Sequence, residues 1–328
     1  MLPASRPKKL SVAVTGANGY IGTLAVPRLL ASPRIGRVLA LDLTEPEHSH
    51  TRLSYAPLDL ARANAVEELT AALERARVEV VVHLAFFSSP VRDSAFAHEV
   101  EAVGTGHVLA ACAAARVRAL VMSSTTLVYG AQPQNPNFLV EDRPLPAHAL
   151  SRYVADKIEA EQQVRAFRRA HSALRSTVLR FAPIVGPTVD TPISRYLGSR
   201  VAPTVFGYDP LIQVVHEDDA AEAIILAVLS GKSGEFNVCA RGVVPLSAAL
   251  RLTGAKALPL LLPVATSALK AFNALGVTAV PTRLLDYLRF LWVADGRKAE
   301  RELGFRPRHT TREALLSFAK ARGRAEAA

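Results

Sequence analysis

The sequence predicts an α/β fold in which a doubly wound parallel sheet is joined to a smaller, mostly C-terminal α/β part that binds the substrate. Short apolar runs alternate six times with stretches of helical pattern as far as Phe181. The runs are apolar throughout rather than alternately apolar and polar, as strands are when helices cover both faces of a sheet. After Phe181 prolines and glycines interrupt the regular pattern, which indicates a second part of different construction.

The expected strands follow one another along the first half of the chain. They are Leu10–Val14, Val38–Leu41, a short strand ahead of Leu58, Val78–Leu84, Ala119–Met122 and Thr177–Phe181. The helices between them include Tyr20–Ala31, Ala63–Arg75, one from about Ala95 to Ala114, and the helix that carries Tyr153. Pro27 predicts a kink or an early end of the first helix, because proline lacks the N–H and its ring clashes with the preceding turn.

This pattern divides the chain into a basic tail, residues 1–9, a nucleotide-binding domain, residues 10–182, a substrate-binding part, residues 183–320, and a frayed tail, residues 321–328. Between residues 183 and 240 only Asp219–Leu229 and Glu235–Cys239 look regular, and residues 212–240 are expected to return to the first domain. The apolar segment 257–293 is interrupted by prolines and charges, so it does not predict a transmembrane helix. It predicts either a helical cap packed on the core or an apolar surface that serves as a substrate lid or faces a membrane.

Composition narrows the classes of partner. The net charge of +10 over 328 residues favours anionic ligands, but the basic residues are dispersed and not interleaved with aromatics, so we expect no nucleic-acid partner. No apolar segment follows the basic N-terminus, so we expect a cytoplasmic protein. Cys112 and Cys239 lack metal-ligand spacing and are expected to be buried, and we expect no metal site.

A glycine-rich turn between the first strand and the first helix predicts a dinucleotide site. Gly16, Gly19 and Gly22 permit a tight turn, the approach of a pyrophosphate and close packing of helix on strand, which is the Rossmann-type arrangement. Asp42 ends the second strand, where a carboxylate accepts hydrogen bonds from the adenosine ribose and repels a 2′-phosphate, so the expected cofactor is NAD. Asp59 either receives the adenine amino group or caps the next helix.

Tyr153 and Lys157 are the expected catalytic pair. Their spacing of four places both on one face of a helix. The ammonium group favours the phenolate and so works to lower the pKa of Tyr153 towards neutral pH. Tyr153 is then suited to act as a general acid or base on a substrate oxygen.

Several motifs together resemble the extended short-chain dehydrogenase/reductase family, also called the NAD-dependent epimerase/dehydratase family. They are Thr15–Gly22, Tyr153-x-x-x-Lys157, Ser123–Gly130, His83-Leu84-Ala85, Arg180–Pro187, Val215–Asp219, Glu235–Val238 and Glu302–Pro307. The resemblance implies that the Thr125 hydroxyl bonds the reacting oxygen and that Lys157 also holds the nicotinamide ribose. The alternative for Thr125 is a hydroxyl bonded to nearby backbone, while His216 and Arg180 are expected to be structural.

The resemblance also implies two sets of contacts. The expected cofactor contacts are Gly16, Asn18, Gly19, Tyr20, Ile21, Gly22, Asp42, Asp59, Leu60, Leu84, Ala85, Lys157 and Phe181. The expected substrate contacts are Thr125, Thr126, Tyr153 and Pro183.

The sequence departs from the family pattern at three places. Glu101 stands where members commonly have Asn, which alters the expected cofactor geometry. Ala182 stands where sugar-nucleotide enzymes of the family often have Asn, and Ile212-Gln213 where they often have a basic residue. These groups normally hold a nucleotide diphosphate, so the usual uridine- or thymidine-diphosphate pocket is not evident.

The function expected is reversible hydride transfer between NAD and a secondary alcohol or ketone, on a small-molecule substrate that is relatively hydrophobic, such as a sterol-like or acyl-chain compound. One alternative is a nucleotide-sugar 4-epimerase or dehydratase with tightly bound NAD, in which Arg283 or Arg289 supplies the diphosphate contact. Another is a non-catalytic dinucleotide-sensing protein. The resemblance allows a homodimer, and the apolar segment allows peripheral contact with a membrane.

Overall fold

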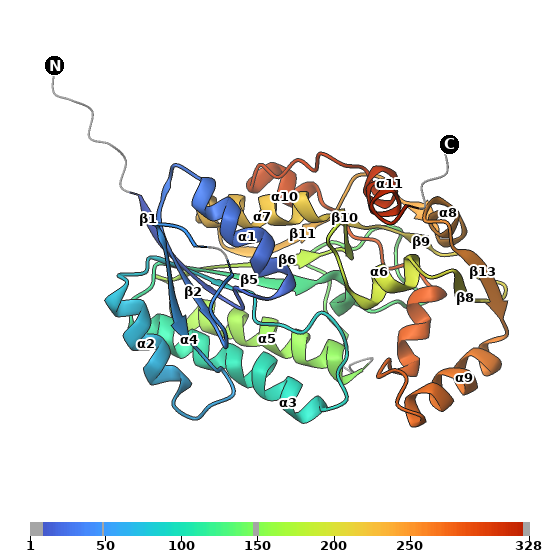
Figure 1. Ribbon diagram of the computed structural model, residues 1–328, viewed down its shortest axis with the longest axis horizontal. Helices are drawn as coiled ribbons and strands as arrows, with labels where there is room; N and C mark the ends of the chain where they lie inside the picture. The colour runs from blue at the N-terminus through green and yellow to red at the C-terminus, as the bar shows by residue number, and fades with distance from the viewer. Residues whose placement is uncertain (1–8, 48, 147–150, 324–328) are drawn as a thin grey trace, which may run out of the picture.

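A seven-stranded parallel sheet forms the centre of the structure, a computed structural model that describes residues 9–47, 49–146 and 151–323 (Figure 1). The strand order is β11-β6-β5-β4-β1-β2-β3. The bounds are β1 Leu10–Thr15, β2 Ile35–Asp42, β3 Leu53–Pro57, β4 Val80–His83, β5 Ala119–Thr125, β6 Arg175–Phe181 and β11 Gly234–Val238. The order reverses beside β1, and in open α/β sheets ligands bind at such a switch point, outside the carboxyl ends of the strands. The predicted fold class is confirmed.

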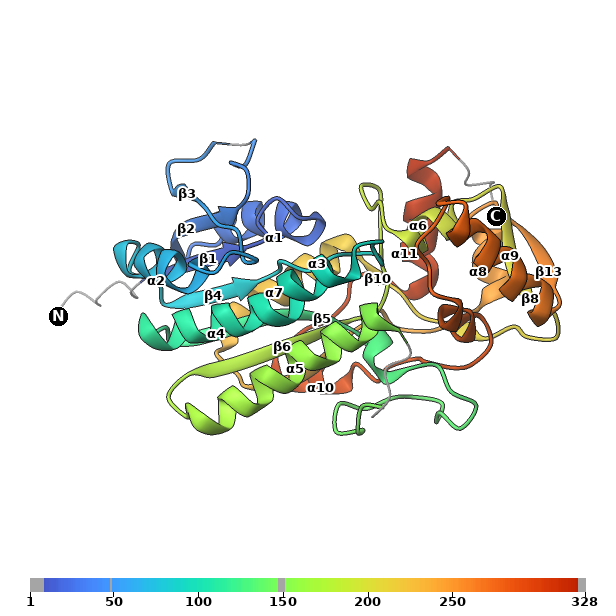
Figure 2. The same cartoon turned by 90° about the horizontal axis from the view of Figure 1, so that it is seen from below.

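Helices cover both faces of the sheet (Figures 1 and 2). On one face lie α1 Tyr20–Ala31, α7 Glu217–Ser230 and α10 Arg297–Glu302, and on the other lie α2 Ala65–Arg75, α4 Gly104–Ala114 and α5 Arg152–Ala170. Each set closes one hydrophobic core against the strands, and both cores contain residues from β1, β2 and β4. Burial on both faces explains why these strands are apolar throughout. Cys112 and Cys239 are both buried, as predicted.

Two helices differ from the prediction in detail. Helix α1 continues past Pro27 to Ala31, so the early end is wrong; Val26, Leu29 and Leu30 are buried in the core, and this packing holds the last turn in place despite the lost hydrogen bond. The helix expected over 95–114 has three pieces, α3 Ser94–His98, the π-helical turn η1 Glu99–Val103 and α4. The π turn contains Glu101, whose carbonyl accepts a hydrogen bond from the Thr105 hydroxyl at 2.5 Å.

The second part of the molecule contains more regular structure than expected. Between residues 183 and 240 the structure adds β7 Ile184–Val185, α6 Pro192–Leu197, β8 Val201–Val205, β9 Leu211–Ile212 and β10 Val215–His216. The prolines that suggested loops occupy sites that tolerate them: Pro192 starts α6 after a Thr191 capping box, and Pro203 lies in a two-stranded sheet. Further along are β12 Val244–Pro245, α8 Leu246–Leu252, β13 Lys256–Leu260, α9 Leu262–Ala274, the 3-10 helix η3 Thr282–Leu288 and α11 Thr311–Ala321.

The chain does not stay in this second part. After β10, α7 packs beside α1 and β11 joins the edge of the main sheet next to β6. The tails were expected at residues 1–9 and 321–328, and most of both, residues 1–8 and 324–328, lies outside the described residues. The expected fraying is wrong at Ala321, which is the last residue of α11. Across the described ranges, no helix combines the length and the apolar composition that crossing a bilayer requires.

Candidate active site

A cavity of about 540 Å³ lies where β1, β4, β5 and β6 end. Its near wall is the start of α1, with Gly19, Tyr20 and Ile21. Its middle contains the chemistry-bearing side chains of β5 and α5, and its far end is closed by α6, β9 and η3. The cavity therefore runs from the nucleotide-binding edge of the sheet into the second part of the molecule.

The predicted site residues divide into those that line this cavity and those that do not. Gly19, Tyr20, Ile21, Leu84, Thr125, Tyr153, Lys157, Phe181 and Pro183 line it. Thr126 is buried beneath the surface and is not among the lining residues, so its expected substrate contact has no support from the cavity described here. The remaining predicted cofactor residues lie at or beside the ends of β1 to β4, outside the cavity.

The glycine turn has the form that a dinucleotide requires. Gly16 adopts a φ of +70°, and a Cβ at that position would lie 2.7 Å from the backbone nitrogen of Ala85. A Cβ at Gly22 would lie 2.2 Å from the carbonyl oxygen of Gly16, so α1 packs directly on the turn. Helix α1 begins immediately after Gly19, where its free N–H groups and positive dipole end favour a phosphate. The backbone here fits NAD, and the contact of this turn with the pyrophosphate remains a prediction.

Asp42 and Asp59 stand at the ends of β2 and β3. The Asp42 carboxylate accepts hydrogen bonds from the backbone N–H groups of Asn18 at 2.8 Å and Leu43 at 2.7 Å, which fixes it beside the glycine turn. Asp59 accepts from the backbone N–H of Ala61, while α2 begins further on, after Asn64, so the helix-capping alternative for Asp59 is wrong. Leu60 is buried against Gly104, and the Leu60 carbonyl oxygen lies 3.0 Å from Nδ1 of His107. The ribose and adenine contacts remain predictions.

Helix α5 presents Tyr153 and Lys157 to the cavity from one face. The Lys157 Nζ lies 4.3 Å from the centroid of the Tyr153 ring. Thr125 ends β5 opposite them, and its Oγ1 accepts a 3.3 Å hydrogen bond from the backbone N–H of Leu127. This backbone bond is the alternative expected for Thr125, but it uses the hydroxyl only as an acceptor, so the hydroxyl proton is free to donate to a substrate oxygen.

Lys157 has a buried carboxylate partner. Its Nζ donates to Glu101 Oε1 at 2.9 Å and to the Phe87 carbonyl at 3.2 Å, and Glu101 Oε1 also accepts from the Phe87 backbone N–H at 2.6 Å. Glu101 is 1% exposed, and its second oxygen has no hydrogen-bond partner within the described part of the chain. The residue that departs from the family pattern is thus bound directly to the predicted catalytic lysine.

These contacts change the expected electrostatics. Burial raises the pKa of Tyr153, and although the Lys157 charge works to lower it, the Glu101 carboxylate works to raise it. The expectation of a lowered pKa for Tyr153 is therefore wrong for this structure, because burial and Glu101 outweigh Lys157. Burial also raises the pKa of Glu101. Burial disfavours the Lys157 ammonium, yet Tyr153 and Glu101 together hold the pKa of Lys157 above its ordinary value.

A series of buried polar side chains connects the backbone carbonyl of Glu101 to β1 and β4. The Oγ1 of Thr15 lies 2.7 Å from His83 Nδ1, and His83 Nε2 lies 3.1 Å from Oγ1 of Thr105, which binds the Glu101 carbonyl. Burial lowers the pKa of His83 to about 3, so the ring is neutral. The position of the π turn thus depends on β1, β4 and α4 at once. Sequence periodicity could not reveal the contact between Glu101 and Lys157. The only signal in the sequence was Glu101 itself, an acidic residue in an otherwise family-like motif.

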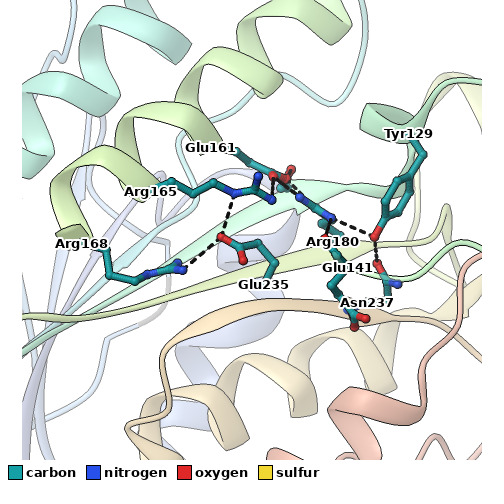
Figure 3. Close-up of polar contacts among 9 residues, drawn as sticks. Tyr129, Glu141, Glu161, Arg165, Arg168, Arg180, Glu235 and Asn237 are labelled. Atoms are coloured by element: carbon teal, nitrogen blue, oxygen red, sulfur yellow. Dashed lines mark hydrogen bonds and ion pairs between the residues drawn. The ribbon is translucent and has the colours of Figure 1, made fainter. Parts of the chain in front are cut away.

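The residues expected to be structural have structural contacts. Arg180 is fully buried and donates to Glu161 at 2.6 Å and to the Tyr129 hydroxyl at 2.8 Å, in a network that extends to Asn237 (Figure 3). His216 caps α7 by accepting from the Asp218 backbone N–H, and its ring stacks on His309. Neither Arg180 nor His216 is among the residues that line the described cavity.

One group of side chains has ligand atoms close enough to hold a metal ion, His98, Asp156 and Glu159, within 4.8 Å of one another. Asp156 Oδ1 already binds His98 Nδ1 at 2.9 Å and the Arg152 guanidinium at 3.0 Å. These contacts occupy Asp156 in a hydrogen-bonded cluster between α3 and α5, and the absence of a metal site remains a prediction.

Comparison with known proteins identifies the class. The model of the NAD dependent epimerase/dehydratase family matches residues 12–239, and the chain belongs to this family. An uncharacterised protein of Mycobacterium tuberculosis is 34% identical over 320 residues, which cover 95% of this chain and 84% of that protein. A 3-diazoavenalumate denitrifying reductase of a Streptomyces species is 30% identical over 238 residues, covering 70% of this chain and 75% of the reductase.

Among solved structures, UDP-glucose 4-epimerase from Thermotoga maritima with UDP-glucose has the same fold. The TM-score is 0.73 at 22% identity, over 96% of this chain and 99% of that one. As a member of the family this protein is an NAD-dependent enzyme, and the alternative of a non-catalytic dinucleotide sensor is not supported.

Proposed function

We propose that this enzyme transfers hydride reversibly between NAD and a secondary alcohol or ketone carbon of a relatively hydrophobic substrate, such as a sterol-like or acyl-chain compound. The observation that carries the proposal is the apolar far end of the cavity. Its walls there are Ile184, Ile193, Leu246, Val280, Leu284, Leu285 and Leu288.

The polar side chains at this end direct their hydrogen bonds into the protein. Gln213 donates to the Ala240 carbonyl and accepts from the Ala294 backbone N–H, which uses both ends of its amide. The Tyr287 hydroxyl donates to the Leu127 carbonyl at 2.6 Å, and the Trp292 indole N–H donates to the Tyr287 carbonyl. Among the described residues that line this end, none presents the charged or multiple hydrogen-bonding groups that a diphosphate needs.

The rival proposal is a nucleotide-sugar 4-epimerase or dehydratase. It is favoured by the similarity of the fold to that of a UDP-glucose 4-epimerase. That proposal needs a cationic diphosphate contact from Arg283 or Arg289. Neither side chain lines the cavity as the described residues define it. Arg289 is instead bound to Asp286 at 2.8 Å and to the Tyr208 hydroxyl at 3.3 Å. The cavity therefore favours the hydrophobic substrate.

The side chains around the cavity suit the proposed chemistry. NAD, when bound, supplies the hydride acceptor or donor. During oxidation Tyr153 accepts the proton from the substrate hydroxyl, and during reduction it returns that proton to the carbonyl oxygen. Thr125 donates a hydrogen bond to the same oxygen and holds it near the phenol. Lys157 stabilises the phenolate by charge, and Phe86 and Phe87 exclude water from the middle of the cavity.

The first test is turnover of Tyr153→Phe, which should fall by at least about 10²-fold because a positioned proton acceptor is lost, while NAD binding is retained. Tyr208→Phe is the matched control, since it removes a hydroxyl from outside the cavity. An active Tyr153→Phe would overturn the role of Tyr153.

The substrate class is tested separately on the NAD-loaded enzyme. In a series of secondary alcohols of increasing chain length, kcat/KM should rise about fourfold per methylene, as expected when each methylene is buried against an apolar wall at about 0.8 kcal/mol. Calorimetric titration with uridine diphosphate and thymidine diphosphate should show no binding. Clear binding of either nucleotide, with no dependence on chain length, would restore the nucleotide-sugar proposal.

A further inference from the structure

The second part of the molecule exposes an apolar surface that the proposed chemistry does not use. In the thirteen-residue helix α9 only Ala265 is buried. Large apolar side chains at its ends stand in solvent, from Phe272 at 50% exposed to Leu275 at 77%. The exposed apolar residues of α9 and its flanks are Leu258, Leu261, Val264, Phe272, Leu275 and Val277. We call them the α9 patch, and both views place α9 at the end of the molecule away from β1 and β2 (Figures 1 and 2).

The charge around the α9 patch has one sign. Residues 241–285 contain no aspartate or glutamate but contain Arg241, Arg251, Lys256, Lys270 and Arg283. Lys256, Lys270 and Arg283 are exposed, on β13, α9 and η3 respectively. Three carboxylates beside this stretch already have partners, since Asp286 binds Arg289, Asp209 binds Ser247, and Asp93, which follows Arg92, accepts from the Phe96 backbone N–H. An apolar surface with a cationic border is complementary to an anionic lipid surface.

The α9 patch lies next to residues that line the cavity. Val280 lies just beyond the patch and lines the cavity, as do three leucines of η3, against which α9 packs. On the other side, the Arg92 guanidinium lies against Gly276, and Arg92 belongs to the loop whose Ser88 and Pro90 also line the cavity. The α9 patch and the cavity are therefore joined through η3 and through the loop that contains Arg92.

We propose that the α9 patch docks on an anionic phospholipid bilayer, with Leu261, Phe272, Leu275 and Val277 inserted at the interface and the basic residues beside the headgroups. A second copy of this chain is a poorer occupant. A twofold pairing of identical patches would bring Lys270 and Arg283 of one copy towards the same cations of the other, with no carboxylate in residues 241–285 to compensate. Docking on a bilayer does not depend on the proposed reaction, because vesicle binding is measured without turnover.

The test is co-sedimentation of the full chain with vesicles of phosphatidylcholine alone and of phosphatidylcholine mixed with phosphatidylglycerol. We expect the chain to bind the mixed vesicles, and to bind the vesicles of phosphatidylcholine alone at least about tenfold more weakly. Binding to the mixed vesicles should decrease as salt is added. Leu275→Glu, and Leu275→Glu combined with Val277→Glu, should weaken binding by about tenfold or more. Leu43→Glu is the matched control, since Leu43 is 64% exposed on the loop after β2 and outside the patch.

Three results would overturn the proposal: no binding of the wild-type chain to the mixed vesicles, equal loss of binding in Leu43→Glu and Leu275→Glu, or a wild-type dimer in size-exclusion chromatography that Leu275→Glu dissociates. The last result would assign the patch to a second copy. Lys270→Glu provides an independent variant and should also weaken binding to the mixed vesicles. Binding that survives while the alcohol series shows no activity would leave the docking surface intact and overturn only the proposed reaction.

Discussion

Helix α5 contributes one residue to each of two buried ion pairs, which differ in how completely their hydrogen bonds are satisfied. In the pair Glu161–Arg180 both side chains are 0% exposed, and the carboxylate also accepts from Ser124 at 2.6 Å. In the pair Lys157–Glu101 the carboxylate has one oxygen without a partner among the described residues, and Lys157 lines the cavity. A satisfied buried pair holds elements together, whereas an incompletely satisfied pair beside a cavity retains bonding capacity for a ligand.

The largest effect should come from breaking the satisfied pair. Arg180→Met leaves Glu161 buried without its charge partner, so the free energy of unfolding should fall by about 3–5 kcal/mol in a denaturant titration. Arg195→Met, which breaks the exposed pair with Asp190, should differ little from wild type. If Arg180→Met were as stable as wild type, the network of Figure 3 would not be a structural support.

Two tyrosine hydroxyls sharpen the same comparison at a smaller scale. Tyr129 donates to Asn237 and accepts from Arg180, both at 2.8 Å, so Tyr129→Phe should lower the free energy of unfolding by about 1.5–3 kcal/mol. The Tyr20 hydroxyl, at the cavity wall, is buried with no partner that the described residues supply, so Tyr20→Phe should leave stability unchanged or raise it. An equal loss of unfolding free energy in the two variants would show that the Tyr20 hydroxyl has a hydrogen-bond partner.

The sequence was sufficient to predict the sheet, the glycine turn and the placement of Tyr153 beside Lys157, because each depends on a local pattern: an apolar run, a strand–glycine–helix order, a spacing of four. It was not sufficient for the features that depend on distant residues. The Lys157–Glu101 contact joins positions 56 apart through a π turn that no periodicity reveals. Pro192 and Pro203 suggested loops, because capping and strand pairing decide how a proline is tolerated, and neither is visible in composition.

The most direct test of the Lys157–Glu101 pair is the variant Glu101→Gln, whose expected effect is a shift of a pH profile. The variant keeps an oxygen that can accept from Lys157 but removes the negative charge that raises the pKa of Tyr153. Tyr153 should therefore deprotonate at lower pH, and the rise of alcohol oxidation with pH should move towards acid. Glu99→Gln is the matched control, because Glu99 is exposed on the same π turn. An unmoved profile, or one moved towards alkali, would contradict the influence of Glu101 on Tyr153.

The same variant makes a second measurement possible, on stability. Burial raises the pKa of Glu101 in the folded chain above its value in the unfolded chain, so the folded state binds this proton more tightly. The resulting stabilisation is present below the unfolded pKa and is lost as pH rises through the folded pKa. Glu101→Gln cannot titrate, so the stability of wild type relative to the variant should decline as pH rises through that interval. A constant difference across the interval would mean that Glu101 is ionised throughout and that Lys157 fully compensates its burial.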